Sequence, residues 1–449
     1  MTAADLTARF ASGALSPVEA ATACLARARE VDATCNAFTR IDDSMALAAT
    51  RASEARWRAG APLGPIDGVP TTIKDIVWVK DWEVRYGTTA VPGVTATEDA
   101  PAVALLRGAG AVILGLTTTP EFGWKAVTDS KLSGITRNPW NTARTPGGSS
   151  GGAAAAAAAG AGVLHLGTDG GGSIRIPSAF SGITGIKPTF GRVPAFPASP
   201  FGTVAHLGPM TRTIADTALM LDAMTARDTR DWFQNPLAFT PCGQLAPRSL
   251  KGLRAGIWDV PAKGTVAPDV AARFKAAIAK LEAAGAIPVP ITLPGEDIWE
   301  LFNAHWYSGA AARLQAIPED RHDVIEAGLR EVAAEGARYS GTDLIRAGIK
   351  RALFGAAFDR LFETVDVVAS PAIPITAFGA GLEVPEGSGL KRWTEWAGFS
   401  YPINLAQAPA CVVPCGFGDD AMPVGLQLIG PRGGDAGVLA VALAFEQLG

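Results

Sequence analysis

The sequence predicts a large α/β protein, on the basis of its length, its composition and a local pattern that occurs three times. The chain has 449 residues, of which 48% are apolar and 18% charged, as is typical of a compact folded protein. In the repeated pattern a helical stretch ends at glycine and an apolar strand follows at once. The three copies are LLRGAGAVILG (105–115), AAAGAGVLHLG (157–167) and LEAAGAIPVPI (281–291).

The N-terminal part is predicted to be helical. Ser16, Pro17 and Glu19 have the spacing of a capping box with proline at the first helical position. A second helical stretch precedes a segment rich in proline and glycine, after which an apolar, β-branched run favours a buried strand. The expected elements are helices at about 17–30 and 43–58 and a strand at 71–79.

The later part of the chain turns helical and then returns to strands. Between about 296 and 363 the pattern is helical, and Trp299, Phe302 and Trp306 fall on one helix face. This face either packs in the core or partly lines a substrate pocket. From about 365 onward strand and loop patterns alternate, and a final helix is predicted near the end of the chain.

Charge and composition exclude several classes of partner. The net charge is −4 with no basic stretch, which argues against nucleic acid binding. The N-terminus lacks the pattern of an export signal, and no apolar run is long enough to cross a membrane, so we expect a cytoplasmic protein. The five cysteines are expected to be reduced thiols, and neither the Cys411/Cys415 pair nor the four histidines have the spacing of a metal site.

The segment TDGGGSIR contains three glycines directly before Ser173. Glycines let consecutive backbone N–H groups converge on one point, which can form an oxyanion hole if a nucleophile lies beside it. Each such donor typically lowers the barrier of acyl transfer by about 3 kcal/mol. Taken alone, the same glycines are more simply interpreted as a flexible turn.

A serine nucleophile also needs a base. GGSSG around Ser149 matches the GxSxG nucleophile elbow, but that motif requires a preceding strand, which TRNPWNTARTP does not favour. Because histidine is scarce, a lysine with a lowered pKa is the candidate base. Lys74 follows the apolar GVPTTI and is expected to enter the core, where burial disfavours the ammonium form. Without the rest of this pattern, Lys74 would be interpreted as an ordinary solvated lysine on the surface.

Three segments in this order, GVPTTIKD, TPGGSSGGAAA and GTDGGGSIRIPSAFSGITGIKPT, resemble the amidase signature family, with 24 residues from Ser149 to Ser173. The resemblance implies a large twisted mixed β-sheet covered by helices on both faces. It extends loosely over nearly the whole chain, so we expect a single amidase domain at 1–449. Its expected parts are N-terminal helices at about 1–60, a catalytic core at about 61–230, a helical substrate-side region at about 296–363 and a C-terminal return to the sheet at about 365–449.

The resemblance also implies the roles of individual residues. Ser173 matches the nucleophile, Ser149 the bridging serine that follows a cis peptide bond, and Lys74 the terminal base of a Ser-cisSer-Lys triad. The implied oxyanion donors are the backbone amides of Gly170, Gly171, Gly172 and Ser173, and the implied supporting residues are Ser150, Asp169 and Arg175. Candidates for an aromatic substrate lining are Phe122, Trp124, Trp393, Trp396 and Tyr401.

The implied function is hydrolysis of a linear amide bond. A small carboxamide would give a carboxylate and ammonia or an amine through a seryl acyl-enzyme, with no metal or organic cofactor, and the protein is compatible with a homodimer. One alternative is the glutaminase subunit of a tRNA-dependent amidotransferase, although TTTPEFGWKAVTDS differs from the MDEFAMGSSTENS typical of that subfamily. Another is a catalytically inactive scaffold, against which the intact triad argues.

The chain departs from the family pattern in its C-terminal third. Where the family often has NxTGxPA, this chain has Asn404-Leu-Ala-Gln-Ala-Pro409-Ala. This difference affects the expected substrate more than the expected chemistry.

Overall fold

In the computed structural model, which describes residues 1–235 and 238–449, eleven strands form one mixed sheet. Their order across the sheet is β1-β5-β2-β8-β10-β9-β14-β15-β13-β11-β12. The bounds are β1 (Phe38–Ile41), β2 (Pro70–Lys74), β5 (Val112–Thr117), β8 (Leu164–Asp169), β9 (Thr184–Lys187), β10 (His206–Thr211), β11 (Arg254–Ile257), β12 (Ile287–Pro290), β13 (Val367–Pro371), β14 (Ala410–Phe417) and β15 (Pro423–Ile429). Two small hairpins pair β3 (Glu83–Val84) with β4 (Val94–Thr95) and β6 (Asp129–Ser130) with β7 (Gly134–Ile135).

Parallel pairing occurs in two places in the sheet. Strand β2 runs parallel to both β5 and β8, and β11 runs parallel to both β12 and β13. The other neighbouring strands are antiparallel. The carboxyl ends of β2 and β8 therefore lie at the same edge, which brings Lys74 close to the segment after Asp169.

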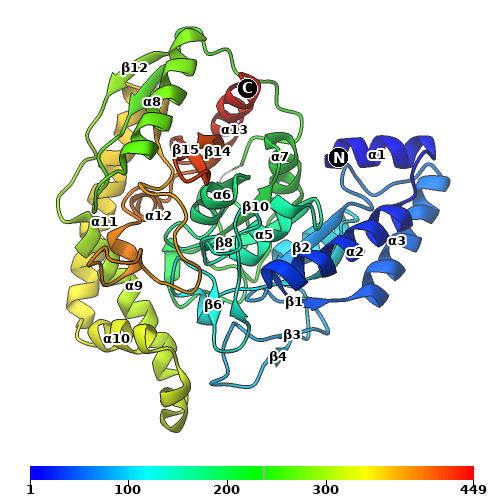
Figure 1. Cartoon of the computed structure of the whole chain (residues 1–449), viewed down its shortest axis with the longest axis horizontal. Coiled ribbons are helices and arrows are strands. Elements are labelled where there is room, and N and C mark those ends of the chain that lie inside the picture. The colour runs from blue at the N-terminus through cyan, green and yellow to red at the C-terminus, as the bar shows by residue number, and fades with distance from the viewer. Residues whose placement is uncertain (236–237) are drawn as a thin grey trace.

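The helices are α1 (Ala3–Ser12), α2 (Pro17–Cys35), α3 (Asp43–Arg58), α4 (Pro101–Gly108), α5 (Gly151–Ala159), α6 (Arg175–Ser181), α7 (Ile214–Ala223), α8 (Pro268–Ala283), α9 (Ile298–Gln315), α10 (Ala327–Gly336), α11 (Gly341–Arg360), α12 (Tyr401–Ala406) and α13 (Asp435–Glu446). Short 3-10 turns are η1 (Glu121–Gly123), η2 (Gly202–Val204), η3 (Glu319–Val324), η4 (Leu361–Glu363) and η5 (Trp393–Glu395). Figure 1 shows α1 to α3 at one end of the molecule and α8 to α11 at the other, with β8, β10, α5 and α6 between them.

Helices cover both faces of the sheet, as expected. Alternate residues of a strand point to opposite faces, and along β13 Val367 and Ala369 belong to one core while Val368 belongs to another. Helices α4, α7, α8 and α13 contribute to the first core, and α6, α9, α11 and α12 contribute to the second. The two cores thus lie on opposite faces of the sheet.

The predicted local patterns are confirmed in the helices. Ser16 Oγ accepts the amide of Glu19, whose carboxylate accepts the amide of Ser16, and α2 begins at Pro17. The three helix-glycine-strand repeats are α4-β5, α5-β8 and α8-β12. The predicted helical region comprises α9, α10 and α11.

The strand predicted at 71–79 is wrong in its second half, because β2 ends at Lys74. The amides of Ile76 and Val77 both donate to the Lys74 carbonyl, so the chain turns there instead of continuing in the sheet. Among the described helices, none has the length and apolar character needed to cross a bilayer. All five cysteines are free thiols in this structure, as expected.

Candidate active site

Lys74 occupies the last position of β2, between β5 and β8, and is completely buried. Its Nζ donates to Ser149 Oγ at 2.6 Å and to Thr168 Oγ1 at 2.9 Å. Both acceptors are neutral hydroxyls, and among the described residues no carboxylate forms a salt bridge with this amine. The parallel pairing of β2 with β8 places Thr168 beside the end of the lysine strand.

Burial lowers the pKa of Lys74 well below its usual range, because an ammonium loses its hydration in the core. The carboxylate of Asp169 opposes this change and does not outweigh it. The environment therefore favours the neutral amine, which can accept a proton from a bonded hydroxyl.

Ser149 and Ser150 lie at the start of α5, after a turn that requires glycine. The Gly148–Ser149 peptide bond is cis. A Cβ on Gly148 would lie 2.5 Å from the backbone of Val127, and Gly147 has φ of +78°, in the left-handed region. No bulkier side chain fits this close approach.

Ser150 links the two glycine-rich segments. Its Oγ accepts the Thr168 amide and donates to the Thr168 carbonyl, each at 3.2 Å. Its own amide donates to the Ser173 carbonyl at 3.2 Å. Ser150 therefore holds the start of α5 against both the end of β8 and the loop that carries Ser173.

The loop from Gly170 to Ser173 borders the cavity, which Gly170 and Ser173 line. The Gly172 amide donates to Asp169 Oδ1 at 2.8 Å, so this predicted oxyanion donor is already engaged. Within the described part of the chain, the amides of Gly170, Gly171 and Ser173 have no hydrogen-bond acceptor. These three amides are available to a developing negative charge.

Aromatic rings pack directly against this loop, which explains why two of its residues must be glycine. A Cβ on Gly170 would lie 2.7 Å from Trp306, and one on Gly171 would lie 2.6 Å from Trp393. Trp306 stacks on Phe201 with ring centroids 3.8 Å apart. Helix α9 and the turn η5 thus pack against the loop through these two tryptophans.

Asp169 and Arg175 form a buried ion pair below the loop, with both side chains fully buried. The guanidinium Nε and Nη2 each donate to one carboxylate oxygen at 3.0 Å. Arg175 also donates to Asn404 Oδ1 at 2.6 Å and to Gln427 Oε1 at 2.8 Å. Asn404 returns a hydrogen bond to Asp169 Oδ1 at 2.8 Å.

This network sets the charge state of Asp169. Burial alone would raise the pKa of its carboxyl group, but the Arg175 guanidinium and hydrogen bonds outweigh it. The pKa of Asp169 is therefore held well below its usual range. The resulting carboxylate accepts the Gly172 amide and so holds the loop.

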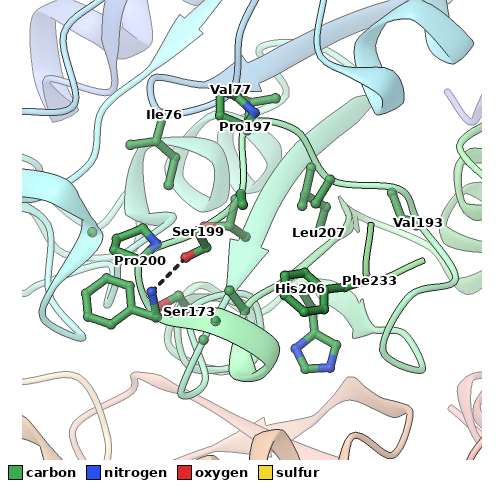
Figure 2. A pocket seen from close by; sticks show the side chains of 18 of the residues that line it. Ile76, Val77, Ser173, Val193, Pro197, Ser199, Pro200, His206, Leu207 and Phe233 are labelled. Atoms are coloured by element: carbon green, nitrogen blue, oxygen red, sulfur yellow. Dashed lines mark hydrogen bonds between the residues drawn. The ribbon is translucent and has the colours of Figure 1, made fainter. Parts of the chain in front are cut away.

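Ser149 and Ser173 line one cavity of about 170 Å³, whereas Lys74 is not among its lining residues and reaches it through its hydrogen bond to Ser149. Ser149, Thr168 and Ser173 are among its polar lining residues. Figure 2 shows Ser173 with Ser199 and Pro200 near it in this view, and His206 and Phe233 further along. The aromatic lining consists of Tyr86, Phe122, Phe190, Phe196, Phe201, Phe233 and Trp306.

The aromatic candidates separate into two groups. Phe122 lines the cavity, as does Trp306 from the helix face singled out in the sequence. Trp124, Trp396 and Tyr401 are buried and are not among the lining residues, and neither is Trp393. Trp393 instead packs against Trp306 and Phe302, behind the cavity wall.

Several residues of the site were not singled out from the sequence. Thr168 bonds Lys74, while Asn404 and Gln427 complete the network around Arg175. The loop VPAFPASPFG (193–202) supplies much of the cavity wall. Its clustered prolines, serine and glycine predict an irregular surface loop, but not its position over Ser173.

Comparisons with known proteins agree over the whole chain. The profile of the family described as Amidase matches residues 19–439. An acylamidase of Rhodococcus erythropolis is 37% identical over 99% of this chain and 95% of its own length. A glutamyl-tRNA(Gln) amidotransferase subunit of Myxococcus xanthus is 34% identical over 100% of this chain and 97% of its own. The structure of a bacterial aryl acylamidase of the amidase signature enzymes superposes with a TM-score of 0.92 at 26% identity, covering 100% of this chain and 96% of that one.

Proposed function

The chain belongs to the amidase signature family, and from this premise we propose that it hydrolyses a small carboxamide through an acyl-enzyme on Ser173. One observation carries the proposal. A fully buried lysine with a lowered pKa bonds Ser149 at 2.6 Å, and Ser149 and Ser173 line the same cavity. Nucleophile, relay and base are thereby supplied without histidine.

In the proposed acylation step, Ser173 Oγ attacks the carbonyl carbon of the amide. The Ser173 proton passes to Ser149 Oγ, and the Ser149 proton passes to Lys74 Nζ. Both serines line the same cavity, which is where this proton transfer would take place. The relay then returns a proton to the leaving nitrogen, and the C–N bond breaks.

The oxyanion formed in this step is stabilised by the amides of Gly170, Gly171 and Ser173. Two or three such donors supply roughly 5–10 kcal/mol of transition-state stabilisation. In deacylation, water attacks the ester carbonyl and gives its proton to the same relay. Ser173 regains its proton, and the carboxylate leaves.

The names of two relatives support an amide substrate. The Rhodococcus relative is named an acylamidase, and the solved relative an aryl acylamidase. The aromatic cavity supports an aryl or alkyl amide, since flat and apolar groups pack well on such side chains. We therefore propose a free-standing amidase that needs no cofactor.

The second candidate is a glutaminase subunit of a tRNA-dependent amidotransferase, and the 34% identity to the Myxococcus relative over the whole chain favours it. The two proposals differ in the fate of ammonia. A free-standing amidase turns over amides alone, whereas a glutaminase subunit requires partner subunits for transamidation. Copurification of tagged chain with partner subunits, together with glutamine-dependent amidation of Glu-tRNA, would select the second candidate.

The test of amidase activity is a panel of aliphatic, aryl and amino-acid amides, with ammonia or amine release measured for the wild type and for Ser173→Ala. We expect turnover of at least one class by the wild type and its loss in the variant. A fluorophosphonate probe should label Ser173 in the folded wild type. Absence of both turnover and labelling would contradict the proposal and favour an inactive scaffold.

A further inference from the structure

Arg313 is a cation on the wall of the catalytic cavity that lacks an acidic partner. It lies in the last turn of α9 and lines the same cavity as Ser149 and Ser173. Among the described residues it forms no salt bridge, and its Nε is buried with no hydrogen-bond partner. A guanidinium without acceptors in a partly buried site is costly, which points to an acceptor supplied from elsewhere.

The guanidinium is held above an aromatic ring. Arg313 Cζ lies 5.1 Å from the centroid of the Phe122 ring, which also lines the cavity. Burial lowers the pKa of Arg313. Because the usual pKa of arginine is very high, the guanidinium still stays charged. Phe122 therefore positions the cation without neutralising it.

Tyr86 supplies a second donor beside Arg313. Its Oη accepts the Trp78 indole N–H at 2.6 Å, and within the described chain its own proton has no acceptor. Burial raises the pKa of Tyr86, and the Trp78 hydrogen bond and the positive charge of Arg313 oppose this change. Tyr86 lines the cavity, with its ring centroid 6.4 Å from that of Phe122.

Two aromatic residues of this part of the cavity wall have an unusual backbone conformation. Tyr86 and Phe122 have φ of 55° and 52°, in the left-handed region that non-glycine residues rarely adopt. The Phe122 amide donates to the Tyr86 carbonyl at 2.7 Å, which joins the two strained positions. Such positions cluster at ligand-binding sites, where the surrounding structure holds them.

The acidic residue of the cavity wall is not an acceptor for the Arg313 guanidinium. Asp231 is the only carboxylate among the described lining residues, and its oxygens accept the amides of Ala195 and Phe233, both at 2.8 Å. It forms no salt bridge with Arg313 in the described part of the chain. The positive charge of Arg313 is thus available to a ligand.

We propose that Arg313 and Tyr86 bind a carboxylate of the substrate, so that the preferred substrates are amides that bear a free carboxylate. N-acyl amino acids and monoamides of dicarboxylic acids belong to this class. The planar guanidinium suits a carboxylate because it can donate two parallel hydrogen bonds. The inference rests on the proposed amidase function and specifies its substrate class.

Two matched substrate pairs test the proposal. Each pair compares an anionic amide with a neutral analogue of similar size that has the same single amide bond: N-benzoylglycine with N-isobutylbenzamide, and glutaranilic acid with hexananilide. The measured quantity is the ratio of kcat/KM for the anionic substrate to that for the neutral one. We expect the wild type to prefer the anionic member of at least one pair.

In Arg313→Met that ratio should fall by about 10- to 100-fold, as expected for loss of hydrogen bonds to a charged group. Tyr86→Phe should lower it less, and Arg313→Lys should restore part of it. Arg346→Met is the matched control, because Arg346 lies on α11 with a side chain 73% exposed, so the substitution removes the same charge outside the cavity. The control should keep the wild-type ratio.

The outcomes separate the two proposals. If the wild type hydrolyses neutral amides at least as well in both pairs, or if Arg313→Met leaves the ratio unchanged, the carboxylate site is wrong while the amidase function stands. If the wild type hydrolyses no amide in the panel, the proposed function itself fails. If Arg313→Met lowers kcat/KM by the same factor for the anionic and the neutral substrate, Arg313 has a structural role and does not bind the carboxylate.

Discussion

Replacing Lys74 by methionine separates catalysis from stability. Methionine keeps a similar length and removes the titratable amine from a fully buried position. The variant loses hydrogen bonds of 2.6 and 2.9 Å to Ser149 and Thr168, which contribute about 1 kcal/mol each. It also loses the cost of burying an amine, so the free energy of unfolding should change by less than about 2 kcal/mol in either direction.

The catalytic effect of Lys74→Met should be larger. Loss of a positioned general base typically lowers the rate about 10²- to 10⁴-fold. That corresponds to roughly 3–5 kcal/mol of transition-state stabilisation, more than the expected change in stability. The assay measures kcat/KM for the best amide of the panel, together with a denaturant unfolding curve. A folded variant that kept most of the wild-type kcat/KM would refute the assignment of Lys74 as the base.

The pH dependence gives a second readout for the same residue. The neutral amine is the proposed base, so kcat/KM of the wild type should fall as acidification protonates Lys74 through its lowered pKa. In the unfolded chain this lysine titrates near its ordinary value, so between the two pKa values the unfolded state binds more protons. Lys74 therefore makes stability rise with pH in that window, and Lys74→Met should abolish this rise. If kcat/KM of the variant falls on acidification in the same way as that of the wild type, the fall is due to another group.

Three further outcomes follow from the geometry. Ser173→Ala should lose fluorophosphonate labelling, measured by intact mass, while its melting temperature stays near the wild-type value; a labelled variant would place the nucleophile elsewhere. Gly171→Ala would put a Cβ 2.6 Å from Trp393, and the displaced loop should cost about 10²- to 10³-fold in kcat/KM, whereas wild-type rates would exclude its amide as an oxyanion donor. Arg175→Met leaves the Asp169 carboxylate buried and unpaired, so chemical denaturation should show a loss of about 3–5 kcal/mol; an unchanged midpoint would contradict the buried ion pair.

The parts of the fold that sequence predicts well depend on neighbours close in the chain. The Ser16 capping box needs only residues three positions apart, and the helix-glycine-strand repeats need only a glycine in the left-handed region. The apolar pattern continues past Lys74 and does not indicate that β2 ends there. The amides of Ile76 and Val77 turn back onto the Lys74 carbonyl, while the amide of Asp75 still donates to the carbonyl of Thr117 on the distant strand β5.

The same distinction applies to the site. Motif spacing identifies Lys74 and Ser149 as candidates. Thr168 looks like any other strand residue in the sequence, and its hydrogen bond to Lys74 joins residues that are 94 positions apart. Arg313 is one of several arginines near a helix end, and only the packing of α9 against the cavity leaves it without a partner among the described residues. Similarly, Trp124 and Trp306 are both buried aromatic residues, and only their positions relative to Ser173 distinguish a core residue from a lining one.

The departure from the family pattern after Asn404 affects the wall of the cavity and leaves the hydrogen bonds of Asn404 in place. Asn404 keeps its hydrogen bonds to Asp169, so the network under the oxyanion loop is complete. Gln407 stands where the family often has glycine, adopts φ of 59° and donates to the Thr203 carbonyl at 3.2 Å. Thr203 follows the cavity-lining residues Phe201 and Gly202, and Phe201 stacks on Trp306. The side chain that glycine would lack thus bonds the loop next to the cavity-lining residues, so on the proposed function this sequence difference should alter substrate preference more than the chemistry at Ser173.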